Sequence, residues 1–242
     1  MRLILLLPLL LSALSPAFSQ SAPPGQTLGP LLYSEDFTHP LTRWTPELES
    51  GGSITSGSGQ LTVDVPAGAT LWFKSLLQGP ILIQYTATVV TAGGANDRLS
   101  DLNCFWMARD SRSPADIFAT KRSGKFADYN QLLTYYVGLG GNGNTTTRFR
   151  RYIGDATLRP LLPEDDLHAA SDFLLANTPQ TLQLVANGPI IQFYRDGKKL
   201  FEMDDPAPYT SGWFAFRTTH SHLVIKSFRI YRLSNSDTPP PR

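Results

Sequence analysis

The sequence has only one cysteine in 242 residues, and this scarcity limits how the chain can be stabilised. A single thiol forms no internal disulfide, which excludes the small disulfide-rich scaffolds. The chain must bury a core instead, and its 41% content of hydrophobic residues allows one. The cysteine, Cys104, lies within the apolar run at residues 102–107. Because apolar surroundings raise the pKa of a thiol, we expect Cys104 to be buried and unreactive.

The sequence also lacks an excess of either charge. Its 21 Lys and Arg residues are balanced by 20 Asp and Glu residues, which leaves a formal net charge of +1. General nucleic-acid binders have a basic excess, and polybasic membrane-surface proteins have basic clusters. The apolar run at residues 3–11 is shorter than the roughly 20 residues that cross a bilayer. We therefore expect no nucleic-acid partner and no membrane span.

The two ends of the chain differ in composition from the rest. Met1-Arg2, the apolar run and the small residues before position 20 are typical of a secretory signal peptide that is cleaved after Ser19. We expect residues 1–19 to be this signal peptide, residues 20–30 a flexible leader and residues 234–242 a disordered tail. No linker or repeat divides residues 31–233, which predicts one domain. We expect a monomer that is secreted or periplasmic.

Amphipathic helices are missing as well. Apolar and polar residues alternate with a period of two through most of the chain, most clearly at residues 61–65 and 81–90. This pattern predicts an all-β sandwich or jelly roll of two antiparallel sheets, with a short helical turn near residues 163–167 or 172–175 at most. A last strand is expected at residues 223–233. Other strands are expected at residues 71–76, 102–108, 132–139, 145–153, 182–186, 190–194, 199–204 and 212–218.

Two parts of the sequence resemble known proteins. Residues 195–201 and 211–217, followed by the last strand, resemble the closing strands of concanavalin A-like jelly rolls. This resemblance implies that the last strand pairs near residues 32–37. A central block is similar to an uncharacterised bacterial family of secreted sandwich proteins; it comprises residues 101–108, 123–126, 135–152 and 159–164. That family is akin to the lectin-like protein of rhamnogalacturonan utilisation and, distantly, to the 3-keto-disaccharide hydrolase domain. The resemblance covers about residues 33–233. It implies a concanavalin A-like lectin/glucanase jelly roll with a polysaccharide-related role, and it assigns no catalytic residue.

The segment between residues 135 and 152 contains the side chains that sugar recognition needs. Aromatic faces cover sugar C–H groups, whereas amides and guanidinium groups bind hydroxyls and carboxylates. Alternation places Arg148 and Arg150 on one face of a strand, about 7 Å apart. Forked hydrogen bonds from this pair could hold a uronate carboxylate, although an exposed edge strand kept soluble by arginines is the alternative. The residues predicted to line a concave groove are Arg148, Arg150, Tyr136, Asn142 and Tyr152.

Asn103 and Trp106 are further candidates for sugar binding. By alternation they lie on opposite faces of one strand, and core packing is the alternative for Trp106. The glycine-rich residues 138–144 are expected to form a groove rim or a long hairpin turn. They lack the strand–loop–helix context of a phosphate loop.

Catalytic groups are harder to find. A retaining glycosidase holds two carboxylates about 5 Å apart, and no strand of this chain has the alternating carboxylates of a jelly-roll glucanase. A lyase needs only a group that neutralises a carboxylate and a His, Tyr or Lys base, and the arginines and tyrosines offer both. The four histidines are expected to be solvated, and none has the spacing of a zinc site. We expect no cofactor and no metal, with Asp36 or Asp204-Asp205 the only candidates for structural calcium.

These observations leave three hypotheses of function. The first is a secreted carbohydrate-binding or carbohydrate-processing protein whose partner is an acidic polysaccharide or its oligosaccharides. The second is a polysaccharide lyase or an atypical glycoside hydrolase on the same fold. The third is a non-catalytic structural or adhesion domain of the envelope. The missing carboxylate pair favours binding over hydrolysis, and the cluster of arginines, aromatics and Asn favours a sugar-related role over a structural one.

Overall fold

The computed structural model describes residues 21–234. The expected signal peptide and the expected tail beyond residue 234 therefore lie outside the described residues. Within them no helix is long and apolar enough to cross a membrane. The first strand begins at Thr27, inside the expected leader, because its residues pair with the last strand from Ser234 backwards.

Nearly all regular structure in the described residues is β-strand. The exceptions are four short 3-10 helices, η1 (Ile117–Ala119), η2 (Phe126–Tyr129), η3 (Pro163–Asp165) and η4 (Ala170–Asp172), and the single turn α1 (Gly141–Asn144). Of these, η3 falls where a helical turn was expected. The strands are β1 (Thr27–Glu35), β2 (Trp44–Leu48), β3 (Ser53–Gly57), β4 (Gln60–Phe73), β5 (Leu77–Gln78), β6 (Ile81–Val89), β7 (Leu102–Asp110), β8 (Leu132–Gly140), β9 (Thr146–Ile153), β10 (Asp166–Leu167), β11 (Gln180–Asn187), β12 (Ile190–Arg195), β13 (Lys198–Asp204) and β14 (Ser211–Ser234).

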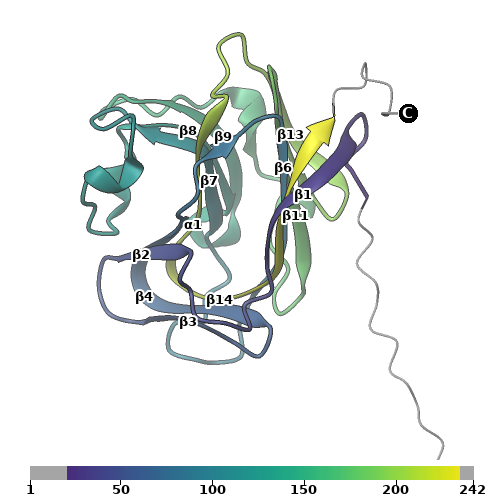
Figure 1. The fold of residues 1–242 in the computed structure, drawn as a ribbon. Helices are drawn as coiled ribbons and strands as arrows, with labels where there is room; N and C mark the ends of the chain where they lie inside the picture. Colours follow the sequence, from purple (N-terminus) through teal and green to yellow (C-terminus); the bar gives the residue numbers. More distant parts are fainter. Residues whose placement is uncertain (1–20, 235–242) are drawn as a thin grey trace, which may run out of the picture.

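The strands form one strongly curled antiparallel sheet with two facing layers (Figure 1). Its main path runs β10-β9-β8-β7-β14-β6-β11-β12-β13. The strand β14 belongs to both layers, because Trp213 to Arg217 pair with β7 and Leu223 to Arg232 pair with β6. The all-β jelly roll is therefore confirmed, with its two layers joined by β14 rather than formed by separate sheets.

The long strand β14 bends where the sequence suggested a break. His220 has a positive φ of 45°, and the pairing of β14 with β4 shifts register between Thr219 and Ser221. A bulge of this kind bends a strand without ending it. At the far end, β14 pairs with β1 through Tyr33↔Ile230 and Glu35↔Phe228, as predicted for the last strand.

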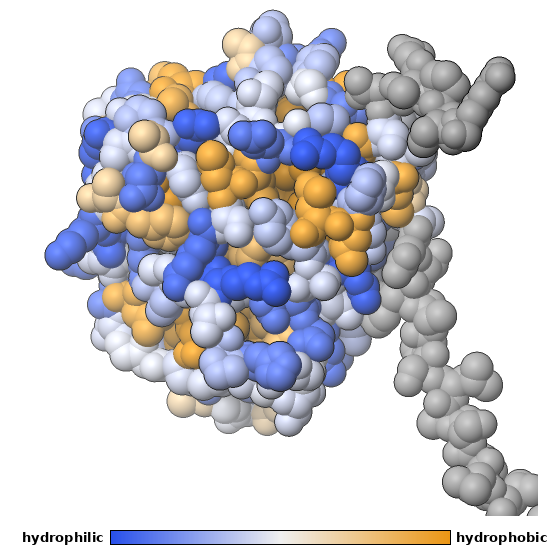
Figure 2. Space-filling view, viewed as in Figure 1, coloured by the Kyte–Doolittle hydropathy of each residue, from blue (hydrophilic) through white to orange (hydrophobic). Residues whose placement is uncertain are grey.

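Three apolar clusters are buried in the described residues, and the two largest of them bear on the site. The larger one fills the space between the layers and contains Cys104, Trp106, Phe149 and Phe216. Cys104 is buried as expected, and burial raises the pKa of its thiol to about 12. The smaller cluster lies on the outer face of the layer that contains β7, β8 and β9. On the face shown in Figure 2, apolar patches at the surface are interrupted by hydrophilic residues.

Candidate functional site

A long connection between β7 and β8 covers part of the outer face of their layer. We call residues 111–131 the covering segment. Its Ile117 and Tyr129 pack on Phe105 and Trp72, which the neighbouring strands supply. The segment is fixed by Arg122, whose Nε donates to Glu47 Oε2 at 3.1 Å and whose Nη1 donates to Asp110 Oδ2 at 3.0 Å. The Arg122 side chain is fully buried, so these ion pairs are shielded from water.

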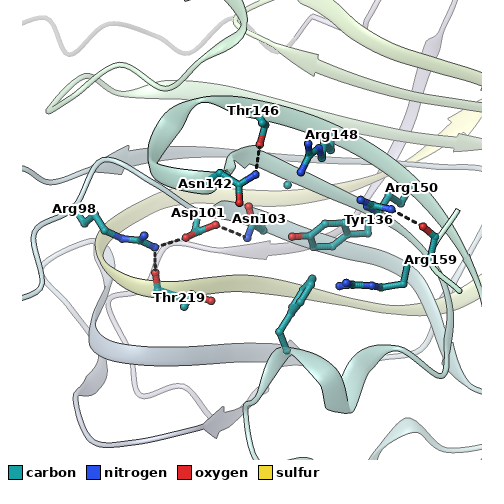
Figure 3. A pocket seen from close by; sticks show the side chains of 13 residues that line it. Arg98, Asp101, Asn103, Tyr136, Asn142, Thr146, Arg148, Arg150, Arg159 and Thr219 are labelled. Carbon is teal, nitrogen blue, oxygen red and sulfur yellow. Dashed lines mark hydrogen bonds and ion pairs between the residues drawn. The ribbon is translucent and has the colours of Figure 1, made fainter. Parts of the chain in front are cut away.

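A cavity of about 390 Å³ lies beside the covering segment on the same outer face (Figure 3). Its floor is made by Asn103 of β7 and by Tyr136 and Gly138 of β8. Side chains two apart on a strand share a face, which is why these three lie together. A Cβ on Gly138 would lie 3.1 Å from the Tyr136 hydroxyl, so a larger residue at this position would press on the Tyr136 side chain.

Four arginines surround the cavity, and only two of them have carboxylate partners. Arg98 pairs with Asp101, whereas Arg148 donates a fork to Asp166 at 2.8 and 3.1 Å. Arg150 and Arg159 form no ion pair with a carboxylate among residues 21–234. Arg150 Nη1 donates to the backbone oxygen of Arg159 at 2.5 Å, and the Arg159 guanidinium lies 5.0 Å from the centre of the Phe126 ring.

The charge on Arg150 is accordingly uncompensated. Burial lowers the pKa of Arg150 from its ordinary value, and repulsion by Arg159 and Arg148 lowers it further. Arginine still remains protonated at any ordinary pH. The cavity thus presents positive charge that an anion would neutralise.

Asn103, at the floor of the cavity, has a buried polar atom without a hydrogen-bond partner. Its side-chain nitrogen lies 3.5 Å from Asp101 Oδ1, but its Oδ1 has no hydrogen-bond partner although the residue is only 4% exposed. A buried acceptor without a partner costs about 1–3 kcal/mol.

The turn between β8 and β9 forms one rim of the cavity. Gly140, Asn142, Gly143 and Asn144 all have positive φ, a conformation that favours Gly and Asn. It directs the exposed Asn142 toward Thr146, with Asn142 Nδ2 3.3 Å from Thr146 Oγ1. Asn144, the first residue of a glycosylation sequon, binds the backbone of Leu174 through both side-chain atoms, at 2.8 and 3.1 Å.

Five of the seven residues predicted to bind sugar line this cavity together. They are Arg148, Arg150, Tyr136, Asn142 and Asn103.

The other two, Trp106 and Tyr152, do not line it, and for these the prediction is corrected. Trp106 is fully buried between the layers, 5.6 Å from the Tyr135 ring and 5.9 Å from the Phe149 ring, because alternation turns it away from Asn103. Tyr152 shares the face of Arg150 but is fully buried in the smaller cluster, 5.6 Å from Tyr136.

Several lining residues were missed by the sequence argument. Arg98 and Asp101 lie in the connection before β7, Phe126 in the covering segment, and Thr219 beside the bend of β14. No periodic pattern marks them, because loops and bulges carry none. Asp101, Phe126 and Arg159 do lie in the block that resembles a known family.

The remaining candidates from the sequence lie elsewhere. Asp205 accepts from Tyr135 and Arg151, each at 2.7 Å, and Asp36 accepts from Thr38. Within residues 21–234, no three His, Cys, Asp or Glu side chains are placed to hold a metal ion. None of the four histidines lines the cavity.

Comparisons with known proteins identify a family and a fold. The family model described as domain of unknown function DUF6250 matches residues 63–228. A protein of unknown function with a galectin-like fold from Bacillus subtilis is similar in structure, with a TM-score of 0.67 and 18% identity over 87% of this chain and 99% of that one. None of the curated proteins matches this chain.

Two carbohydrate-related structures are also similar. The carbohydrate-binding module CBM66 from Bacillus subtilis has a TM-score of 0.52 and 11% identity, over 78% of this chain and 96% of that one. LamA of Z. galactanivorans, in complex with laminaritriose and laminaritetraose, has a TM-score of 0.57 and 11% identity, over 85% of this chain and all of that one. At these identities the likeness concerns the fold alone.

Proposed function

Since this chain belongs to the family described as domain of unknown function DUF6250, its function must be inferred from its own site, and we propose that the cavity binds an acidic sugar. The ligand would be a uronate-containing polysaccharide or one of its oligosaccharides. The observation that carries the proposal is the pair Arg150 and Arg159, two guanidinium groups at one cavity with no carboxylate partner among residues 21–234.

The polar groups of the floor fit a sugar rather than a simple anion. A uronate carboxylate neutralises Arg150 or Arg159 by charge-assisted hydrogen bonds. The Tyr136 hydroxyl offers a further donor, and Asn142 offers an amide at the rim. This mixture of guanidinium, amide and phenol groups is what a hydroxyl-rich anion requires.

The carboxyl and phenol groups of the site support binding over bond cleavage. Asp101 is the only carboxylate among the described residues that line the cavity, and it pairs with Arg98. The described residues that line the cavity therefore lack the second carboxylate that a two-carboxylate glycosidase needs. Burial raises the pKa of Tyr136 well above its ordinary value, so its phenol stays protonated and donates a hydrogen bond instead of removing a proton.

We propose in addition that the protein is exported from the cytoplasm. Residues 1–19 have the composition of a signal peptide, and the polymers in question lie outside the cytoplasm. Solved neighbours that include a carbohydrate-binding module and a laminari-oligosaccharide complex support a sugar as the ligand. We therefore propose a secreted or periplasmic protein that binds an acidic glycan.

Matched pairs of sugars test this function. Calorimetric titrations would compare oligosaccharides of glucuronate with those of glucose, or of galacturonate with those of galactose, which differ only in the carboxylate. We expect the uronide to bind at least about tenfold more tightly, the effect of about 1.4 kcal/mol. Equal affinity of the neutral and acidic partners would refute the proposal. The ultraviolet absorbance of unsaturated uronides, followed in the same samples, would reveal lyase activity.

A further inference from the structure

The covering segment closes the cavity in two directions, and we propose that the site binds the terminus of a glycan chain rather than an internal stretch. This inference rests on the proposed function and specifies which part of the acidic glycan enters. A chain bound by its interior must leave a site at two ends. The covering segment blocks two of the directions in which such a chain could leave this cavity.

The first closed direction runs along the strands, away from the turn between β8 and β9. The next outward-facing residues on β7 and β9 are Phe105 and Tyr152, and both are fully buried. The Phe126 ring of the covering segment lies 5.7 Å from the Tyr136 ring, directly beside the floor. Arg159 packs on Phe126, as described above, and so joins the covering segment to the connection after β9.

The second closed direction runs across the strands toward β4 and β2. Here the backbone of Gly124 contacts the backbones of both strands, and only glycine fits. A Cβ on Gly124 would lie 2.4 Å from Glu49 N, and a Cβ on Gly68 would lie 2.4 Å from Gly124 O. Backbones in such close contact leave no space for a sugar ring.

Two buried arginines fix the covering segment to the rest of the fold. Arg217, only 1% exposed, donates from Nη1 to Gly124 O at 2.6 Å and to Thr70 Oγ1 at 3.1 Å. Arg122 holds the middle of the segment through Glu47 and Asp110. Lifting the segment would expose these ion pairs and the smaller apolar cluster, which is costly. The cavity volume of about 390 Å³ lies near the lower end of the roughly 300–1,000 Å³ range of small-molecule sites, and so suits one or two sugar rings.

The side away from the covering segment is not closed by that segment. Figure 3 shows Arg98 at the opposite end of the cavity from Arg150 and Arg159. A terminal uronate held near Arg150 and Arg159 would direct the rest of its chain away from the covering segment.

A length series of uronides tests the inference without any mutation. Galacturonate oligomers from the monomer to the hexamer would be titrated by calorimetry, together with polygalacturonate cut to different mean lengths at constant total mass. We expect affinity to stop increasing by about the trimer, since the cavity suits one or two rings. We also expect the number of proteins bound per mass of polymer to rise in proportion to the number of chain ends.

The possible outcomes separate the two proposals. End recognition is overturned if affinity rises steadily to the hexamer, or if the amount of protein bound per mass of polymer does not change when the chains are cut. Either result leaves acidic-sugar binding intact. Absence of binding by every uronide overturns both. A variant pair adds a structural check: Phe126→Ala removes the wall, and we expect it to restore a gain in affinity with length. Phe118→Ala is the matched control, because Phe118 belongs to the same segment and packs on Trp213 away from the cavity.

Discussion

Replacing Arg150 by alanine separates a binding role from a structural one. Its guanidinium makes one hydrogen bond within the chain, to the backbone oxygen of Arg159, and no ion pair with a carboxylate among residues 21–234. Losing that bond costs about 1 kcal/mol of folding stability. Removing a cation from beside Arg148 and Arg159 relieves repulsion in return. We therefore expect the free energy of unfolding of Arg150→Ala to stay within about 1 kcal/mol of the wild type.

The effect on binding should be much larger. A hydrogen bond between charged groups contributes about 1.5–3 kcal/mol, which corresponds to a roughly 10- to 150-fold rise in Kd. Arg150→Lys should recover only part of the loss, because an ammonium keeps the charge but not the fork. Arg148→Ala should cost less than Arg150→Ala, since Asp166 already occupies the Arg148 fork.

Calorimetry with a uronide, paired with urea unfolding, measures both quantities. Arg43→Ala is the matched control, because Arg43 is an exposed arginine outside the cavity. Wild-type affinity in Arg150→Ala would refute the reasoning. So would a loss of affinity that is accompanied by an equal loss in Arg43→Ala.

Three further predictions concern the fold. Burial, with repulsion from Glu164, raises the pKa of the Asp165 carboxyl from 3.8 to about 6, so its protonated form is favoured in the folded state. The contribution of the protonated carboxyl to stability is full below pH 3.8 and is lost as the pH rises through about 6. In urea unfolding, Asp165→Asn should therefore raise the free energy of unfolding by about 1–2 kcal/mol at pH 7–8 and change it little at pH 4. Arg122→Met should lower the free energy of unfolding by about 3–5 kcal/mol, because it leaves the Glu47 and Asp110 carboxylates without their partner under the covering segment. An unchanged free energy of unfolding would show that this segment is loosely held. Cys104 should resist a bulky thiol reagent in the native protein and react on unfolding; rapid native labelling would contradict its burial.

The face of each strand followed from the sequence because side chains alternate strictly along a strand. Arg148 and Arg150 were assigned to one face, and Asn103 and Trp106 to opposite faces, and the structure has both arrangements. Alternation does not tell which of two faces is the interior, however. Alternation alone therefore leaves Trp106 as a candidate for binding, and its packing against Tyr135 and Phe149 places it in the core. Tyr152 is on the predicted face but is shielded by a distant part of the chain.

Local pattern also determined the β class and the burial of Cys104, because each depends on the arrangement of apolar residues along the chain, whereas the pairing of the last strand with the first was implied by the resemblance to concanavalin A-like jelly rolls. Tertiary structure alone decided three other features. The strands expected at residues 212–218 and 223–233 form one strand, since a bulge at His220 bends β14 and keeps its pairing. Arg98 and Arg159, far apart in sequence, surround one cavity because loops bring them together. The covering segment reaches across the sheet through Arg122 and Glu47, 75 residues apart, and such long-range contacts leave no periodic signal in a sequence.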